Sequence, residues 1–520
     1  MTRLWWGRST AAQPAEADSG GSHDFARFSD TSAAKADLKR NAVRGFSQTL
    51  ALGAAEFALR LAFTAVLARL VSPEQFGLFM VVAAVTAIAD QFRDLGLSTA
   101  TIQRENITHQ EVSNLFWINA AAGVLLAVVI SALSPLVSLY FREPRLTAVT
   151  IALASTFVLS SLSVQHEALL GRQMRLGPKA VMRLVAFTIS SGVATAMAMA
   201  DYGYWSLVWR EIVRSALIVA AAWVLCRWVP SRPRAGTDVR ALVRFGSGLT
   251  ATYMLTSLAS GLDRFLLGRL QGAAVVGLYR QSYQLVMAPM AQLMGPLYQV
   301  SLPSMSMLQD QPDRFRRAYA RIVSIVATVS MPLGVLIAIC ADEITSVVLG
   351  PRWSGAGTFI RIFAVGALVQ SVFSTMGFVL VSLGRSAELL KLTIVHTAWR
   401  VALMSAGAVW GGYGVAVADV ASTATAFLPF LHWAMRGSAV STATFLTALA
   451  RPFFASVFLA GALALLRAFL PAGAPATSLA ASVGLTLLAF PAAVILLPGG
   501  RADVKAVSSM VTSLMIRARE

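Results

Sequence analysis

Long blocks of apolar residues constrain this chain more than any other feature of its sequence. A helix of about 20 residues spans the hydrocarbon core of a bilayer, and blocks of that length follow one another with short connections between them. This pattern predicts an all-α polytopic membrane protein with about 14 transmembrane helices. The blocks lie near residues 46–68, 78–100, 113–139, 147–168, 179–200, 203–226, 246–268, 275–299, 318–340, 358–382, 388–408, 412–435, 450–470 and 477–498.

The charge content excludes a soluble protein and a nucleic-acid-binding protein. Charged residues make up 13% of the 520 residues and hydrophobic residues 56%, whereas a soluble domain carries about 25% charged residues. The net charge of +18 does not form a basic patch. The basic residues lie in short loops between the apolar blocks, as the positive-inside rule expects of a membrane protein.

The distribution of Lys and Arg predicts the orientation. With the N-terminus inside, 29 of the 43 basic residues fall in or beside the inner segments and only seven fall in outer loops. This bias predicts an even number of spans and cytoplasmic termini at both ends of the chain. The seven outer residues are Arg69, Arg142, Arg145, Arg269, Arg352, Arg361 and Arg467.

An internal repeat divides the chain. Arg69-Leu70 and Gly77-Leu78 recur 200 residues later as Arg269-Leu270 and Gly277-Leu278. Further along, Leu170-Gly171-Arg172 and Tyr202-Gly203 recur as Leu383-Gly384-Arg385 and Tyr413-Gly414. Each repeat holds six spans, so both halves enter the membrane from the same side, as parallel repeats do. We therefore expect two parallel six-helix bundles around a central cavity, plus a C-terminal helix pair.

The predicted domains follow from this repeat. The disordered cytoplasmic tail covers residues 1–40, the first bundle 41–226, a basic cytoplasmic linker 227–245, the second bundle 246–436, the extra helix pair 450–498 and a cytoplasmic tail 499–520.

Several segments resemble one transporter family. They are LARLVSPEQFGLF and DQFRDLGLSTATIQR in the first half, and RFGSGLTATYMLTSLASGLDRFLLGRLQGAAVVGLYRQSYQL, LPSMSMLQDQPDRFRRAY and VVLGPRW in the second. Together they are similar to polysaccharide-transporter-type flippases of the multidrug/oligosaccharidyl-lipid/polysaccharide exporter superfamily, over roughly residues 40–435. The resemblance implies a bacterial inner-membrane flippase that moves undecaprenyl-pyrophosphate-linked oligosaccharide repeat units for exopolysaccharide or lipopolysaccharide. It also implies partners in polysaccharide polymerisation and export.

Charged residues inside the apolar blocks are the candidate site residues, because a charge at the bilayer centre costs roughly 3 kcal/mol on insertion scales. Guanidinium groups bind phosphate in a bidentate way, so the arginines are candidates for the cargo pyrophosphate, with Arg60 and Arg93 the first choice. Intramembrane salt bridges that only brace helices are the alternative, favoured for Asp263, Arg264 and Arg280. The candidate cations are Arg60, Arg93, Arg210, Arg214, Arg264 and Arg280. The acids that could couple an ion or position an arginine are Glu56, Asp90, Asp94 and Asp263.

The sequence contains no HExxH, P-loop or GxSxG motif and no spaced Cys/His cluster. We therefore predict no enzyme activity, cofactor or metal. Two rival functions stay open. A drug/cation antiporter of the same superfamily should favour carboxylates over arginines inside the membrane, and here arginines outnumber acids. A membrane glycan polymerase would need a larger extramembrane domain or loop, and no outer loop exceeds about 17 residues.

Overall fold

The computed structural model describes residues 38–94, 96–104, 107–173, 175–234, 261–470 and 474–500, and all regular structure within these ranges is helical. Nine helical stretches of this described part are long and apolar enough to cross a membrane. The predicted all-α polytopic fold is confirmed. The total of 14 spans stays a prediction, since most of the block 246–268 lies outside the described residues. Most of the two predicted tails and the part of the linker beyond Arg234 also lie outside the described residues.

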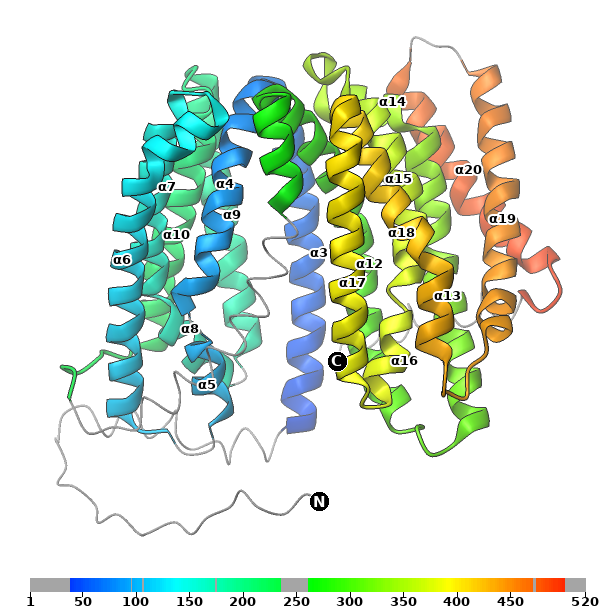
Figure 1. The fold of residues 1–520 in the computed structure, drawn as a ribbon, viewed down its shortest axis with the longest axis horizontal. Helices are drawn as coiled ribbons and strands as arrows, with labels where there is room; N and C mark the ends of the chain where they lie inside the picture. Colours follow the sequence, from blue (N-terminus) through cyan, green and yellow to red (C-terminus); the bar gives the residue numbers. More distant parts are fainter. Residues whose placement is uncertain are drawn as a thin grey trace.

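The helices form two groups that stand side by side (Figure 1). The helices of the first half are α3 (Leu38–Leu70), α4 (Pro73–Asp94), α5 (Leu97–Gln103), α6 (His109–Phe141), α7 (Arg145–Ser161), α8 (Val164–Arg172), α9 (Leu176–Met199) and α10 (Trp205–Cys226). The second half begins with helical residues 261–270. It continues with α12 (Ala273–Ser306), α13 (Pro312–Ile339), α14 (Ala341–Ile344), a π-helical turn (Thr345–Leu349), a 3-10 turn (Pro351–Trp353), α15 (Ala356–Phe373), α16 (Met376–Ser382), α17 (Ser386–Gly407), a 3-10 turn (Ala408–Trp410), α18 (Gly411–Met435), α19 (Thr442–Phe469) and α20 (Pro475–Leu496).

Three predicted blocks are each broken into two helices. The block 78–100 breaks between α4 and α5, where Gly96 has φ +68° and the Asp94 carboxylate accepts a hydrogen bond from the Ser98 backbone N–H at 2.9 Å. The blocks 147–168 and 358–382 break at runs of hydroxyl residues. There Ser163 and Ser374 bond to backbone carbonyls three residues earlier, in competition with the helix hydrogen bonds. Hydropathy does not register such breaks.

The arginine of the repeated Leu-Gly-Arg segment donates to carbonyls at a helix end in both halves, but the two helices are not equivalent. Arg172 follows the broken pair α7–α8 and donates through Nη1 to the Thr101 carbonyl at 3.2 Å. Arg385 follows the broken pair α15–α16 and donates through Nη1 to the Arg436 carbonyl at 2.8 Å. Thr101 lies at the end of the second predicted span of its half and Arg436 follows the sixth span of the other, so these contacts do not test the predicted repeat.

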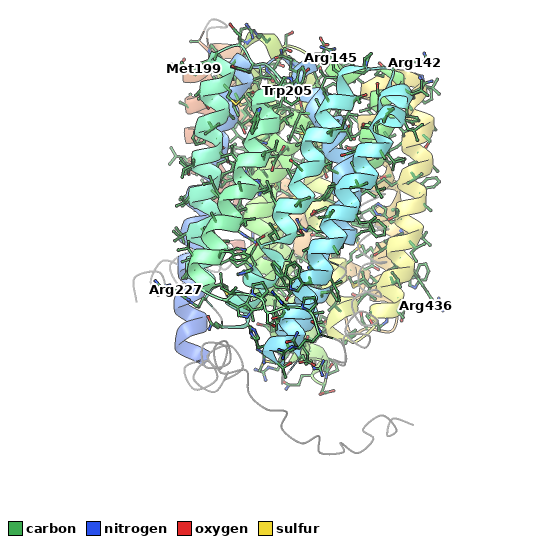
Figure 2. All side chains as sticks on the ribbon, turned by 90° about the vertical axis from the view of Figure 1, so that its left-hand side faces the viewer. Arg142, Arg145, Met199, Trp205, Arg227 and Arg436 are labelled. Carbon is green, nitrogen blue, oxygen red and sulfur yellow. The ribbon has the colours of Figure 1, made fainter. Side chains whose placement is uncertain are left out.

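The two ends of the helix bundle differ in how the halves pack. We call the end where α3 finishes and α4 starts the closed end; Arg142 and Arg145 lie there, and Arg227 and Arg436 lie at the opposite end (Figure 2). At the closed end one core joins both halves, because residues such as Leu67 pack in the same cluster as Trp353. Toward the opposite end each half has a core of its own. One contains only residues between 97 and 228, and the other only residues between 294 and 449. The two halves therefore share a hydrophobic core at the closed end and have separate cores toward the opposite end.

Candidate functional site

A cavity of about 960 Å³ lies between the inner helices of the two halves. Its walls come from α3, α4, α7, α8, α9 and α10 of the first half and from α12 of the second. Along α3 the lining extends from Leu67, near the closed end, to Glu56, a rise of about 16 Å in an α-helix. The cavity therefore extends along the bundle from near the closed end toward the opposite end.

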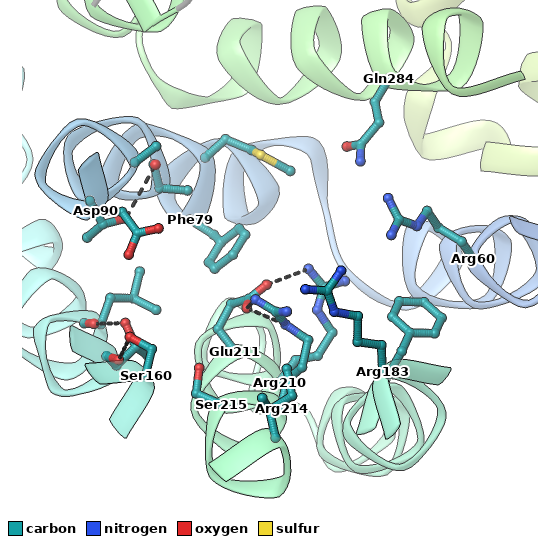
Figure 3. A pocket seen from close by; sticks show the side chains of 18 of the residues that line it. Arg60, Phe79, Asp90, Ser160, Arg183, Arg210, Glu211, Arg214, Ser215 and Gln284 are labelled. Atoms are coloured by element: carbon teal, nitrogen blue, oxygen red, sulfur yellow. Dashed lines mark hydrogen bonds and ion pairs between the residues drawn. The ribbon is translucent and has the colours of Figure 1, made fainter. Parts of the chain in front are cut away.

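The lining is rich in ionisable groups. Among the described residues, six arginines and four carboxylates line the cavity, so cations exceed anions by two. Figure 3 shows Arg60, Arg183, Arg210 and Arg214 on the first-half walls and Gln284 of α12 on the facing wall. The arginines are Arg60, Arg93, Arg183, Arg210, Arg214 and Arg280, and the acids are Glu56, Asp90, Glu167 and Glu211.

Most of the arginines are paired with a carboxylate of the same wall. The Arg60–Glu56, Arg93–Asp90 and Arg183–Glu167 pairs each have a nitrogen–oxygen distance of 3.0 Å. Two of these pairs lie within one helix, because residues three or four apart share a helix face. The third joins α9 to α8. Each carboxylate offsets the charge of its arginine while no anionic ligand is bound.

Two arginines of α10 share one carboxylate. Glu211 binds Arg214 tightly, with 2.6 Å between Oε2 and Nη2, but its Oε1 lies 3.7 Å from Nη2 of Arg210. That is the longest ion pair of the six cavity arginines. The Arg210 guanidinium carbon lies 5.9 Å from the centre of the Phe79 ring, within the range of a cation–π contact. Arg210 is therefore the cavity arginine whose charge is least compensated by a carboxylate.

Arg280 brings a cation from the second half of the chain. Its Nη1 lies 3.2 Å from Oδ2 of Asp263, whose side chain is 3% exposed. Its guanidinium carbon lies 5.0 Å from the centre of the Tyr283 ring, another cavity residue. Cations from both halves therefore line the same cavity, and Asp263, which does not line it, holds Arg280 by an ion pair.

The structure places the predicted residues as follows. Arg60, Arg93, Arg210, Arg214, Arg280, Glu56 and Asp90 line the cavity. Arg264, Asp94 and Asp263 are not among the lining residues. Asp94 instead bonds to Ser98 at the start of α5, and Arg264 lies beside Asp263. Position along a span gives depth in the membrane and leaves open which face a side chain occupies.

Three charged cavity residues are absent from the predicted site residues: Glu211, which lies beside two predicted arginines, and Arg183 and Glu167. Arg183 and Glu167 lie near the ends of their blocks, where the positive-inside pattern predicts ordinary interfacial charges. Arg183 and Phe187 both line the cavity, and their spacing of four residues on α9 places them on one face. A charged residue and an aromatic residue four positions apart was the sequence signal that could have indicated a cavity-facing side of this helix.

Aromatic rings and uncharged polar groups complete the lining. Phe63, Phe76, Phe79, Phe157 and Phe187 provide the rings, and Gln281, Gln284, Ser160 and Ser215 provide amides and hydroxyls. Guanidinium groups bind phosphates in a bidentate way, amides and hydroxyls exchange hydrogen bonds with polar ligands, and rings pack against apolar faces. The arrangement suits a large ligand that combines an anionic group with a polar, flexible body.

Comparison with known proteins identifies a family, relatives and a similar fold. The family model for "Polysaccharide biosynthesis protein" matches residues 66–358. The chain is 24% identical to the lipopolysaccharide biosynthesis protein WzxC of Escherichia coli (strain K12) over 375 residues, 67% of this chain and 72% of WzxC. It is 20% identical to the succinoglycan biosynthesis transport protein ExoT of Rhizobium meliloti (strain 1021), over 68% of this chain and 72% of ExoT.

Among solved structures, the chain is similar to the lipid II flippase MurJ in an inward closed conformation. The TM-score is 0.68 with 10% sequence identity, over 85% of this chain and 97% of MurJ. At this identity the likeness concerns the fold alone. The family model, in contrast, covers more than half of the chain. The chain therefore belongs to the polysaccharide biosynthesis protein family, and it is a multi-pass membrane protein with the fold of MurJ.

Proposed function

We propose that the protein flips undecaprenyl-pyrophosphate-linked oligosaccharide repeat units across the bacterial inner membrane by alternating access. The observation that carries this proposal is the cavity of about 960 Å³ inside a membrane helix bundle, lined by six arginines and four carboxylates. WzxC and ExoT, to which the chain is similar, are named for lipopolysaccharide and succinoglycan biosynthesis. This supports a lipid-linked sugar as cargo, for later polymerisation and export.

The cavity charges suit a pyrophosphate. A diphosphate diester carries two negative charges at neutral pH, and the lining has two more cations than anions. Hydrogen bonds to charged groups contribute about 1.5–3 kcal/mol each, so a few guanidinium contacts offset the loss of hydration of the diphosphate. The amides, hydroxyls and rings of the lining are then available to the sugar units. Arg210 would make the first contact, because its own carboxylate is the most distant.

The orientation and the packing support alternating access. The seven basic residues predicted outside all lie near the closed end, and Arg352 and Arg467 donate to main-chain carbonyls there. The closed end would then face the periplasm and both termini the cytoplasm. Among the described residues the halves share a core at the closed end and have separate cores toward the other end. In this orientation the structure would be sealed on the outside and its cavity would receive cargo from the inside.

A gene deletion tests this function. In cells without the gene, we expect secreted polysaccharide to be lost while lipid-linked repeat units accumulate on the cytoplasmic face of the inner membrane, and the wild-type gene should restore both. The measurements are secreted polymer and the sidedness of the lipid-linked units. Unchanged polymer would favour the drug/cation antiporter. Units that reach the outer face but stay unpolymerised would favour a polymerase, and either result would reject the flippase.

A further inference from the structure

The closed end is built from contacts that occur twice, at equivalent positions of the two halves. A Cβ atom on Gly77 of α4 would lie 1.7 Å from the carbonyl oxygen of Ala273, and one on Gly277 of α12 would lie 1.9 Å from that of Pro73. These glycines are 200 residues apart, the offset of the sequence repeat. The starts of α4 and α12 therefore touch backbone to backbone, at positions where only glycine fits.

Each half also covers the end of the other half's first helix with an aromatic ring. Trp353, which follows α13 and α14, is fully buried and donates through Nε1 to the Ala68 carbonyl of α3 at 2.7 Å. Phe141, the last residue of α6, packs on Gly268, where a Cβ atom would lie 2.7 Å from its ring. Ala68 and Gly268 are again 200 residues apart. The contacts across the closed end thus follow a pseudo-two-fold arrangement.

The two covering contacts differ in chemistry. On the Trp353 side, three hydrogen bonds join the halves. Besides the Trp353 bond, Arg352 donates to the Leu70 carbonyl at 3.1 Å, and Arg69 donates to the Val347 carbonyl at 2.8 Å. On the other side, Phe141 stacks on Phe265 with ring centres 6.0 Å apart. One contact is directional and the other is apolar.

These hydrogen bonds lie at a helix end, where breaking them leaves polar groups without partners. The last carbonyls of an α-helix have no partner within the helix. At the end of α3, Ala68 and Leu70 obtain donors from Trp353 and Arg352 of the other half. Separating the halves would deprive these carbonyls and a fully buried indole N–H of their partners at the same time. The apolar Phe141 contact is non-directional, so a ring can slide over a glycine without losing a hydrogen bond.

From this asymmetry we infer that Thr345–Trp353 is the latch of the outer gate. In the outward-facing step Trp353 and Arg352 release the end of α3, while the Phe141–Gly268 contact persists and the halves turn about it. This inference rests on the alternating access of the proposed function, but it does not depend on the identity of the cargo.

Thiol labelling from outside tests the latch. Cys226 and Cys340, both buried, are replaced by serine, and Gln284→Cys places a single thiol in the cavity. Whole cells are treated with a membrane-impermeant maleimide. Trp353→Phe keeps a ring but removes the N–H, and Arg352→Gln removes the second donor. We expect each to raise the labelling rate by roughly five- to tenfold, because one net hydrogen bond is lost from the closed state only.

The matched control is Arg361→Gln. Arg361 also lies at the closed end, but its partner at 2.8 Å is Asp342 of the same half, so its loss should leave the labelling rate unchanged. The latch is rejected if neither Trp353→Phe nor Arg352→Gln raises the rate, or if Arg361→Gln raises it equally. Since the labelling needs no cargo, a protein that opens by this latch but flips no lipid-linked sugar would contradict the proposed function alone.

Discussion

Replacing Arg210 by alanine should reduce the rate of lipid-linked sugar flipping about 100-fold at an unchanged level of protein in the membrane. Arg210 is the cavity arginine most distant from its carboxylate, at 3.7 Å from Glu211. It therefore gives up the least ion-pair energy when its guanidinium group binds an anionic cargo. One or two charge-assisted hydrogen bonds at roughly 1.5–3 kcal/mol each correspond to this factor. The measurement is the initial flipping rate in vesicles or the polymer produced by complemented cells.

Two further variants sharpen this result. Arg210→Lys keeps the charge but not the bidentate geometry, so we expect a loss of about tenfold. Arg316→Ala removes an exposed arginine at the opposite end of the bundle, which pairs with Asp313 outside the cavity, and it should leave flipping unchanged. If Arg210→Ala flips cargo at the wild-type rate, Arg210 braces α10 and does not bind the pyrophosphate.

Replacing Glu211 by glutamine is the second large change that we expect. Glu211 holds Arg214 at 2.6 Å and lies within 3.7 Å of Arg210, so its neutralisation leaves two neighbouring cations without a shared anion. Because these side chains are partly exposed to the cavity, we expect the free energy of unfolding to fall by about 1–2 kcal/mol, less than for a fully buried pair. Thermal unfolding of the purified protein measures this.

A double-mutant cycle separates pairing from other effects. Glu211→Gln combined with Arg214→Gln removes one of the two unpaired cations, the one that Glu211 holds at 2.6 Å, and should recover most of the lost stability. Asp313→Asn breaks an exposed pair of similar geometry, 2.7 Å from Arg316, and should cost at most about 0.5 kcal/mol. Equal effects of Glu211→Gln and Asp313→Asn would show that water in the cavity screens the α10 charges completely.

The sequence was most informative where the membrane penalises a residue type. Blocks of about 20 apolar residues have few alternatives to spanning helices, so the described helices follow the predicted blocks, although three blocks are broken into two helices. Charges inside such blocks are expensive, which is why the sequence alone points to Arg60, Arg93, Arg210 and Arg214. Arg183 was not predicted because a charge near the end of a block costs little free energy and is therefore no evidence of a functional role.

Two aspects of the site depend on three-dimensional contacts. Asp94 and Arg264 lie at suitable depths, yet the local fold turns Asp94 to Ser98 and leaves Arg264 beside Asp263. Hydropathy gives no signal for either outcome. The contacts of the closed end are equally remote in sequence. The offset of 200 pairs Gly77 with Gly277, but it does not say that each glycine touches the backbone of the opposite half.

The most direct test of the central claim is a flipping measurement on the purified protein. Liposomes containing the protein and a fluorescent undecaprenyl-pyrophosphate-linked oligosaccharide are treated with an impermeant glycosidase, and protein-free and Arg210→Ala liposomes serve as controls. If the protein is a flippase, cleavage should proceed beyond the outer-leaflet half of the oligosaccharide in wild-type liposomes only. Cleavage that stops at one half in wild-type and control liposomes alike would contradict lipid-linked sugar transport by this cavity.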